Sequence, residues 1–236
     1  MAFTLPTASG RWMYCNTCLM EEPGHESWIF GCRSVMDRAI TLTIGVVSDT
    51  HVPDYASALH PGLTEALSAA GVQHILHAGD ICTPMVLKDL GRVAPVTAVR
   101  GNRDWLFQNS LPWVRSIKLA GVSIAIVHGH GSWGNYLQDK LYYYLEGYRL
   151  DRYKSLLHGA VPEAKVVVFG HTHYSEVCWD VGKLLFNPGS ATITMKGYSG
   201  PSFGLLRIYP GALVEAEVVE LRGAKLQNRN WVGLDQ

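Results

Sequence analysis

Short apolar runs that end in polar or turn-forming residues recur along the chain from Thr41 onward. A run of this length, closed in this way, is typical of a buried β-strand. The pattern predicts strands over residues 42–47, 74–78, 96–99, 122–127 and 166–169.

Helix boundaries lie between several of these strands. Residues 61–70 and 84–90 each begin with a proline and are followed by a glycine, which predicts two short helices. A longer helix is predicted from about Asn135. Its apolar face consists of residues at helical spacing: Leu137, Leu141, Tyr144, Leu145 and Tyr148.

The C-terminal third of the chain reads mainly as strands. A hairpin is predicted to turn over residues 180–182, and the alternation across residues 214–218 predicts one buried face and one face in water, with Glu215 and Glu217 on the wet side. Strand–helix alternation followed by strands indicates an α/β protein. We expect two facing sheets, partly parallel and partly antiparallel, with helices outside them.

Bulk composition narrows the class. The chain has 236 residues, 47% hydrophobic and 17% charged, with zero formal net charge, as expected for a soluble globular protein without a membrane or nucleic-acid surface. We see no apolar run of membrane-spanning length and no signal peptide. Five cysteines without a repeating framework fit reduced thiols, so we expect a cytoplasmic protein.

Three regions are expected along the chain. Residues 1–40 lack a clean period and form an N-terminal extension that is either disordered or an artefact of the start site, since Met36 leads directly into the first strand. Residues 41–222 form the main domain, and residues 223–236 form a C-terminal tail. We predict that residues 1–35 are dispensable.

A zinc site within the extension is the alternative. Four nitrogen or sulfur ligands are available there, namely Cys15, Cys18, His25 and Cys32. A single Cys-x-x-Cys pair with irregularly spaced partners supports this site only weakly, and we favour the later start.

Five polar motifs follow five of the predicted strands: Asp49-Thr50-His51, Gly79-Asp80, Gly101-Asn102-Arg103-Asp104, His128-Gly129-His130 and Gly170-His171-Thr172-His173. Taken alone, a strand-ending Asp or Asn often caps a turn. An ordered set of carboxylate, amide and imidazole groups instead favours two divalent cations such as Mn, Ni, Fe or Zn. Two such cations form a phosphoester-cleaving centre.

This ordered set resembles the signature of the calcineurin-like metallophosphoesterases. The later Asn187-Pro188-Gly189-Ser190 is similar to the small YfcE-type phosphodiesterase branch, and the resemblance covers about residues 44–208. It implies a four-layer αββα sandwich with a dinuclear site at one edge. The implied activity is hydrolysis of phosphodiesters, with phosphomonoesters as further substrates.

The resemblance also implies ligand assignments. Asp49, His51 and His173 would hold the first metal; Asn102, His128 and His171 would hold the second; and Asp80 would bridge the two. A hydroxide between the metals is then expected to attack phosphorus in line.

Two positions depart from the family pattern. Arg103 stands where many larger members have a leaving-group acid, and it is expected either to hold a phosphate oxygen or to pair with Asp104 or another carboxylate. His130 is the other candidate acid, although it could pack beside His128 or exchange roles with it. Lys196 stands near the position of an arginine in the branch.

Two further functions stay open. The same fold serves as a non-catalytic binding scaffold in a retromer subunit that has lost some metal ligands, whereas here every ligand position is filled. A nucleotide-specific phosphatase is the other alternative. The expected partner is a small phosphoester substrate, and a homo-oligomer is compatible with the sequence.

Overall fold

The structure is a computed structural model. It describes residues 39–107, 110–131, 134, 142–195 and 200–234, together with the backbones of residues 5–6 and 12–13. Three expectations therefore fall outside the described residues: the cysteine and histidine set of the extension, Lys196, and the start of the helix predicted from Asn135.

The first sheet is mixed. Its strands β3, β4 and β5 run parallel, with β5 at the edge, whereas β11 pairs antiparallel with both β3 and β12. A short N-terminal strand, β2, adds to the outer edge beside β12. In spatial order the seven strands are β1 (Leu5–Pro6), β2 (Trp12–Met13), β12 (Leu213–Glu220), β11 (Ser202–Tyr209), β3 (Leu42–Val47), β4 (His74–His77) and β5 (Val96–Ala98).

The second sheet is also mixed. Strands β7, β8 and β10 run parallel, and the antiparallel strands β6 and β9 lie at its edges. The order is β6 (Val114–Leu119), β7 (Val122–Val127), β8 (Val166–Val168), β10 (Lys183–Pro188) and β9 (Ser175–Asp180). Each sheet therefore combines parallel and antiparallel strands, which confirms the two partly parallel and partly antiparallel sheets that we expected.

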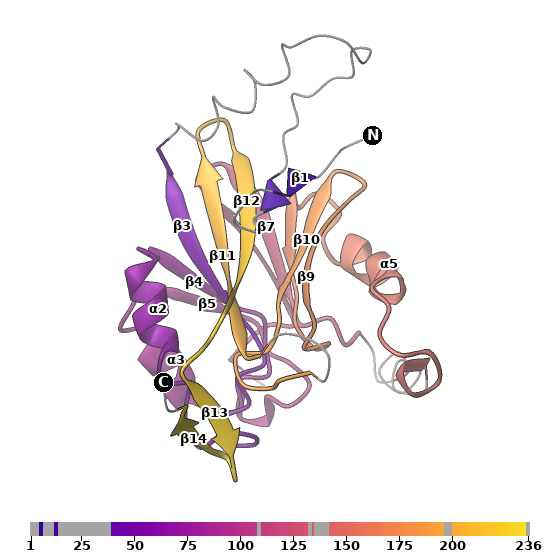
Figure 1. Ribbon diagram of the computed structural model, residues 1–236. Helices are drawn as coiled ribbons and strands as arrows, with labels where there is room; N and C mark the ends of the chain where they lie inside the picture. The colour runs from indigo at the N-terminus through magenta and orange to yellow at the C-terminus, as the bar shows by residue number, and fades with distance from the viewer. Residues whose placement is uncertain are drawn as a thin grey trace.

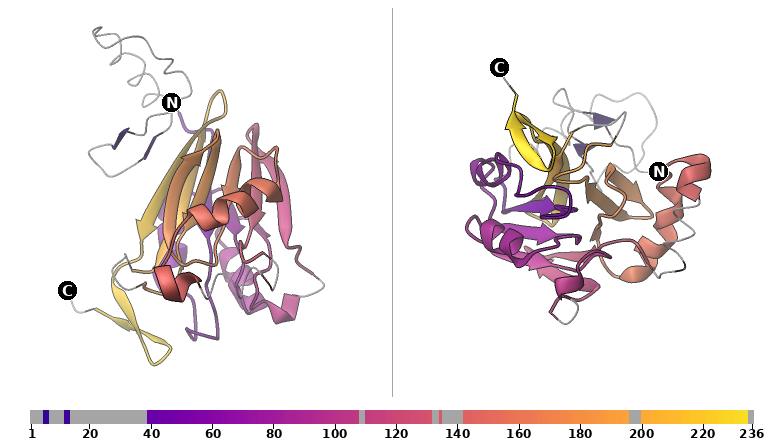
Figure 2. Two further views of the ribbon diagram at one scale, coloured as in Figure 1. Left: turned by 90° about the vertical axis from the view of Figure 1, so that its right-hand side faces the viewer. Right: turned by 90° about the horizontal axis from the view of Figure 1, so that it is seen from below.

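Helices cover the outer face of each sheet, which gives four layers (Figures 1 and 2). Helices α2 (Leu63–Ala69) and α3 (Pro84–Leu90) bury Leu67 and Leu90 against the first sheet. Helix α5 (Asp151–Ala160) buries Leu157 against the second sheet. Between the sheets lies a third core that includes Ile44 and Phe186. Because alternate residues of a strand face opposite sides, each sheet serves two cores, and the αββα sandwich is confirmed.

Several element boundaries agree with the prediction. Strands β3 and β7 and helix α3 have the predicted bounds, and β9 and β10 turn at Val181-Gly182. Helix α2 begins two residues after Pro61, because His60 organises the preceding turn. The His60 carbonyl accepts the Leu63 amide, and its Nδ1 accepts the Gly62 amide.

The apolar face predicted for the helix after Asn135 is wrong for the part that the structure describes. Residues 142–146 are helical, but Tyr144 and Leu145 are 86% and 64% exposed. Tyr148 lies beyond this helical segment and stacks on Tyr174 with ring centroids 4.4 Å apart. A periodicity pattern counts tyrosine as an apolar residue, although its hydroxyl also allows the ring to remain exposed to water.

The alternation across strand β12 also failed in one respect. Glu215 was expected on the wet face, but it is only 5% exposed and accepts a hydrogen bond from the Tyr209 hydroxyl. Glu217, on the same face, pairs with Arg207 at 2.7 Å. Because each carboxylate has a polar partner, it can lie on a face that is partly shielded from water. The residue types alone had predicted that this face is exposed to solvent.

The region expected to be a tail contains a β-hairpin, formed by β13 (Ala224–Gln227) and β14 (Asn230–Gly233). It lies at the lower end of the molecule in Figure 1, the end toward which strand β3 runs.

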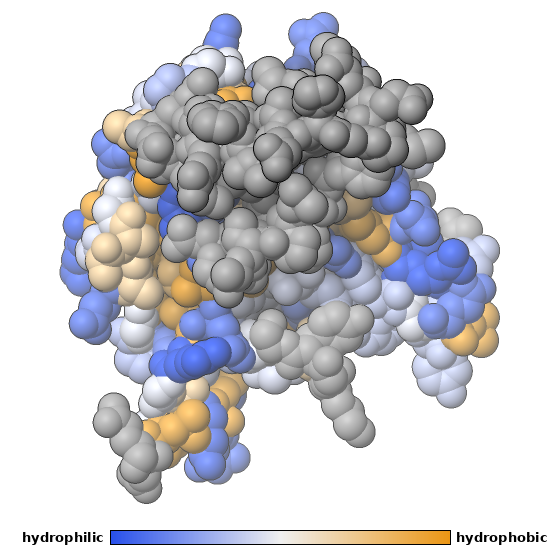
Figure 3. All heavy atoms as spheres, turned by 45° about the horizontal axis from the view of Figure 1, so that its top comes forward, coloured by the Kyte–Doolittle hydropathy of each residue, from blue (hydrophilic) through white to orange (hydrophobic). Residues whose placement is uncertain are grey.

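Among the described residues, no helix is long and apolar enough to cross a membrane. Hydrophilic and hydrophobic residues are interspersed over the described part of the face drawn in Figure 3.

Candidate metal centre

The five polar motifs converge at one edge of the sandwich. Strands β3, β4 and β5 of one sheet and β7 and β8 of the other each end just before a motif. Within each sheet these strands are parallel, so their carboxyl ends share an edge. The loops beyond those ends carry all seven residues that the resemblance implied as ligands.

Five of those seven residues adopt the left-handed backbone region that non-glycine residues rarely occupy. They are Asp49, His51, Asp80, His171 and His173, with φ between 47° and 69°. Each such conformation costs on the order of 1–3 kcal/mol and persists only when its surroundings enforce it. Five of the eleven non-glycine residues with positive φ in the described part of the chain therefore belong to this one cluster.

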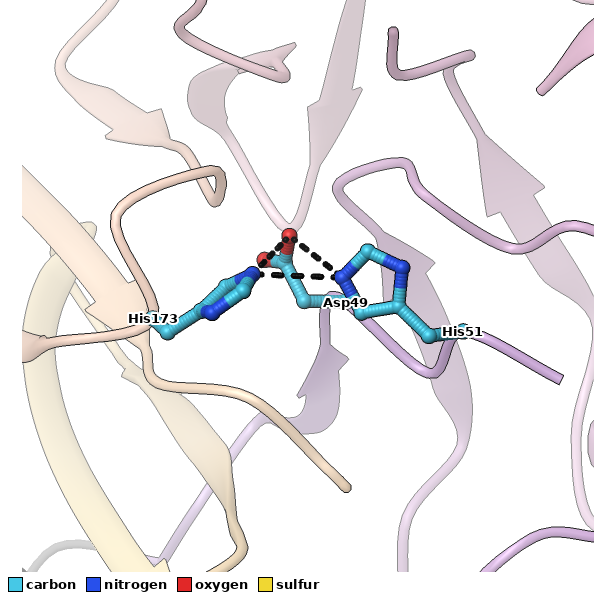
Figure 4. Close-up of side chains that lie close together, drawn as sticks. All are labelled: Asp49, His51 and His173. Carbon is cyan, nitrogen blue, oxygen red and sulfur yellow. Dashed lines mark hydrogen bonds and ion pairs between the residues drawn. The ribbon is translucent and has the colours of Figure 1, made fainter. Parts of the chain in front are cut away.

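Three of the side chains form a compact triangle (Figure 4). The Nε2 atoms of His51 and His173 lie 3.2 Å apart, and they lie 3.7 Å and 3.3 Å from Asp49 Oδ1. A tetrahedral ion with bonds of about 2.0–2.1 Å separates neighbouring ligand atoms by roughly 3.3 Å. The triangle therefore has the size of one face of a metal coordination shell.

Asp80 lies between this triangle and a second group. Its Oδ2 is 3.8 Å from His51 Nε2, whereas its Oδ1 is 3.4 Å from His128 Nε2. The same His128 nitrogen lies 3.1 Å from Asn102 Oδ1. Asp80 thus faces both groups, as a carboxylate shared between two cations would.

A backbone contact fixes the orientation of His128. Its Nδ1 lies 2.7 Å from the Ala78 carbonyl, to which it donates, and this leaves Nε2 facing Asp80 and Asn102. Donation of the other ring N–H to a carbonyl is the arrangement usual for metal-binding histidines.

The remaining imidazoles border this second group. The ring centroid of His171 lies 5.2 Å from that of His128 and 6.0 Å from that of His130. His130 sits 5.4 Å from His128 on one side and 4.9 Å from Trp113 on the other, and its buried Nδ1 has no hydrogen-bond partner. It therefore lies beside the seven-residue cluster, with its ring facing both histidines of the second group.

Burial and charge set the protonation of these groups. Burial by itself would raise the carboxyl pKa values, but nearby imidazoles overcome it: His173 lowers the pKa of Asp49, and His128 lowers that of Asp80 to about 2. Burial opposes a charge on His128 too, yet Asp80 and Asp49 raise its pKa to about 10. Both carboxylates are therefore ionised near neutral pH.

Other imidazoles of the site are held neutral. Burial lowers the pKa of His51 and brings that of His171 to about 3, with the neighbouring His128 adding to the effect on His171. A neutral imidazole offers a nitrogen lone pair to a metal without first losing a proton.

The donor set fits a metal on one further observation. Asp49 Oδ1 is fully buried among polar groups and has no hydrogen-bond partner, while Asp49 Oδ2 accepts from the Ser48 hydroxyl and the His171 amide. An unpaired buried carboxylate oxygen is costly unless a cation compensates it. The unpaired oxygen is the one that faces His51 and His173.

Two glycines permit the loops to approach this closely. A Cβ added at Gly101 would lie 2.1 Å from Asp80 Oδ1, and one added at Gly170 would lie 1.9 Å from Ser48 Oγ. Both distances are impossible for a real side chain, so only glycine allows the motifs to pack around the carboxylates.

Arg103 forms an ion pair with another carboxylate, Asp54, rather than with the adjacent Asp104, and this is one of the pairings that the sequence left open. Its Nη1 donates to Asp54 Oδ2 at 3.1 Å, and its guanidinium lies 5.2 Å from the centre of the Tyr55 ring. Its backbone amide donates to Asp80 Oδ1 at 2.8 Å. The 42%-exposed guanidinium therefore sits at the rim of the cluster, while its backbone belongs to the inner wall.

Asp104 has a role that the sequence did not reveal. Its Oδ1 accepts the amides of Ile81 and Cys82, and its Oδ2 accepts the amide of Gly101, all at 2.7 Å. The carboxylate therefore joins the loop that carries Asp80 to its own loop. No motif spacing signals this contact, because the partners are backbone groups.

The turn Asn187–Ser190 supports two of the motif loops. Asn187 Nδ2 donates to the Gly170 carbonyl and lies 3.1 Å from the Thr172 hydroxyl, while the Ser190 hydroxyl donates to the Asp49 carbonyl at 2.8 Å. The turn therefore acts as a structural support beside the site.

Comparison with known proteins agrees with the arrangement. The sequence model of the calcineurin-like phosphoesterase superfamily domain matches residues 42–211. A "Probable metallophosphoesterase" of Methanothermobacter thermautotrophicus is 33% identical over 190 residues, which cover 80% of this chain and 99% of that protein. Another, from Methanocaldococcus jannaschii, is 35% identical over 155 residues, 65% of this chain and 70% of that protein.

The fold is also similar to that of a solved structure, vacuolar protein sorting 29 from Cryptosporidium parvum. The TM-score is 0.54 at 20% identity, and the match covers 78% of this chain and 99% of that one. The chain belongs to the calcineurin-like phosphoesterase superfamily, whose members bind divalent metals.

Proposed function

We propose that the protein is a dinuclear metal-dependent phosphoesterase that hydrolyses phosphodiesters. The observation that carries the proposal is the convergence of seven oxygen and imidazole ligands, five of them on strained backbone, around a buried carboxylate oxygen that accepts no hydrogen bond from the described residues and faces two imidazoles. The strain and the incompletely compensated charge both destabilise the fold, and bound cations would offset the second of these.

In this proposal Asp49, His51 and His173 hold one cation, and Asn102, His128 and His171 hold the other. Asp80 faces both groups and is assigned as the bridge. Carboxylate, amide and imidazole donors suit Mn, Ni, Fe or Zn, and the ligand set does not distinguish among these metals. Bound there, the two ions would supply activated water and stabilise the charge on the phosphoryl oxygens.

The side chains at the rim would bind and orient the substrate. Arg103 places a permanent positive charge beside Asp80 and can donate two hydrogen bonds to a phosphoryl oxygen pair. Because arginine cannot give up a proton near neutral pH, it offers no acid to the leaving group. His130, whose buried Nδ1 is unpaired, is the remaining candidate for that contact.

The test is metal-dependent hydrolysis. Metal-free protein should be inactive toward bis(4-nitrophenyl) phosphate and regain activity with one of the four metals. Asp80→Asn should abolish most activity and lower the metal content, because the change weakens both groups at once. A matched control is Asp89→Asn, whose carboxylate pairs with Arg92 on the surface. Full activity in rigorously chelated protein would contradict the proposal.

A panel of substrates defines the reaction further. Phosphomonoesters, cyclic nucleotides and diesters assayed with each metal would separate a general phosphodiesterase from a nucleotide-specific phosphatase. We expect diesters to be cleaved faster than monoesters.

A binding scaffold on the same fold is the second candidate, favoured by the structural likeness to vacuolar protein sorting 29. The complete ligand set argues for the enzyme instead. A scaffold would bind metal stoichiometrically in calorimetry and yet turn over none of the panel.

A further inference from the structure

We infer that the C-terminal hairpin β13–β14 positions one wall of the active site, through the segment of residues 53–60. The inference rests on the proposed function and concerns which part of the chain sets substrate binding. The matched family domain ends at residue 211, so the hairpin lies beyond it. In Figure 1 the hairpin lies at the lower end of the molecule, the end toward which β3 runs. Asp49 lies two residues after the end of β3.

The hairpin docks on this segment through several polar contacts. The Ser57 amide donates to the Arg229 carbonyl at 2.7 Å, and the Ser57 hydroxyl donates to Asn230 Oδ1 at 2.8 Å. The Trp231 indole N–H donates to the Ala58 carbonyl at 2.9 Å. The Arg229 guanidinium donates to the Pro53 carbonyl. The hairpin thus holds backbone groups of the segment at Pro53, Ser57 and Ala58.

An aromatic contact holds the far end of the segment. The Trp231 ring lies edge-on to His60, with centroids 4.6 Å apart, and His60 is only 2% exposed. His60 in turn organises the start of helix α2. Trp231 therefore joins the hairpin to a buried part of the domain.

The turn of the hairpin has a strained backbone, and one of its side chains makes a contact with the segment. Asn228 and Arg229 form the two-residue connection with φ of 45° and 66°. Such turns prefer glycine at the second position, because a side chain there is disfavoured. Arginine at this position supplies the guanidinium that reaches Pro53, a contact that glycine could not make.

The held segment faces the proposed substrate site. It begins two residues after His51, and its Asp54 accepts a hydrogen bond from the Arg103 guanidinium at 3.1 Å. The Tyr55 ring lies 5.1 Å from the His51 ring and 5.2 Å from Arg103. Displacing the segment would therefore move Arg103 and Tyr55, while Asp49 Oδ2 stays bound to Ser48 and His171.

The test is a double substitution that leaves the hairpin folded. Arg229→Gly removes the guanidinium and suits the turn, and Trp231→Phe removes the indole donor but keeps a ring. We expect KM for bis(4-nitrophenyl) phosphate to rise roughly three- to tenfold, the effect of about one hydrogen bond, with kcat and metal content nearly unchanged. The Ser57 amide should exchange its hydrogen faster. Lys225→Ala, an exposed change on β13, is the control.

A double-mutant cycle ties the effect to Arg103. In an Arg103→Ala background the hairpin substitutions should raise KM by a smaller factor, since one of the two side chains that they position is gone and only Tyr55 remains. Additive effects would overturn the inference, as would an unchanged KM in the hairpin variant or a loss of metal in step with activity. Unaltered protein without hydrolysis under any metal would instead overturn the proposed function, and the inference with it.

Discussion

At the scale of single residues, Arg103 combines an exposed charge with a buried backbone contact. Its guanidinium is held by Asp54 over Tyr55, and burial, which alone would lower its pKa, is outweighed by these partners, which raise it. Arg103 is therefore charged at every pH at which the fold is stable. In the proposed function the side chain therefore donates hydrogen bonds to the anionic substrate and does not act as an acid.

This role predicts a preference for good leaving groups. Aryl phosphodiesters should be cleaved faster than alkyl ones, and Arg103→Ala should lower kcat/KM for aryl esters about 10- to 100-fold. That is less than the ~10²–10³ lost with a well-buried oxyanion donor, because the guanidinium is 42% exposed. Steady-state kinetics on matched aryl and alkyl esters measures both effects. Unchanged kinetics in Arg103→Ala would show that the residue is structural only.

His77 lies behind the site and carries the clearest acid sensitivity. It is fully buried; its Nδ1 accepts the Gly79 amide at 3.2 Å, and its Nε2 lies 3.3 Å from the Thr50 hydroxyl. Burial lowers its pKa from 6.5 to about 3. Between pH 6.5 and about 3, His77 therefore binds a proton in the unfolded chain but stays neutral in the folded chain.

The expected result is a loss of stability as the pH falls from about 6.5 toward 3, since the unfolded state binds more protons across that window. The free energy of unfolding, measured by urea titration at several pH values, tests it. His77→Gln should show a shallower fall between pH 6.5 and 4 than the unaltered protein. Parallel curves for the two proteins would contradict this account.

At the scale of elements, the loops after β4 and β5 behave as one unit because Asp104 joins them. Its three backbone contacts at 2.7 Å hold Ile81 and Cys82, which follow Asp80, and Gly101, which precedes Asn102. Burial raises the pKa of Asp104, and the accepted amides oppose that rise.

Asp104→Asn places an amide donor against backbone N–H groups and leaves at least one of them unpaired. We expect about 1–3 kcal/mol less stability and weaker metal binding. Urea unfolding and metal titration measure the two effects, with the exposed Asp151→Asn on α5 as control. Normal metal affinity in Asp104→Asn would mean that the ligand loops hold their shape independently.

The elements also separate what a sequence can foretell from what it cannot. Strand β3 and its Asp49 were predictable, because an apolar run closed by a polar residue reflects burial followed by a turn. The pairing of Arg103 with Asp54 was not, since 49 residues separate the two and only the fold brings them together. The Asp104 contacts were hidden because backbone amides carry no sequence signal.

Weak signals hid two further elements. The hairpin β13–β14 turns through Asn228-Arg229, which lacks the glycine that usually marks such a connection. The edge strand β6 is largely exposed and has no clear apolar run.

At the scale of the whole molecule, the site depends on both sheets. The first supplies Asp49, His51, Asp80 and Asn102, and the second supplies His128, His171 and His173. The core between the sheets therefore determines the distance between the two ligand sets. The N-terminal strand β2 joins the outer edge, where Trp12 and Met13 lie opposite β12 and β1 pairs on its other side.

This arrangement predicts that a protein starting at Met36 folds, binds metal and hydrolyses diesters as the full chain does. The seven proposed ligands and the three cores all lie within residues 42–224. Melting temperature, metal content and activity of the truncated protein test it. A drop of several degrees or precipitation would assign the extension to the fold, and metal analysis of Cys15, Cys18, His25 and Cys32 would then be required.

The left-handed backbone at the ligand positions has an evolutionary consequence. A residue that relaxes there, such as glycine or asparagine, would lower the strain while deleting a ligand, so losing the reaction would gain stability. Loss of a ligand at one of these positions would therefore raise the free energy of unfolding while it removed the proposed activity. Acquiring the ligands one at a time would add backbone strain at each step, and the proposed activity would appear only when the set is complete.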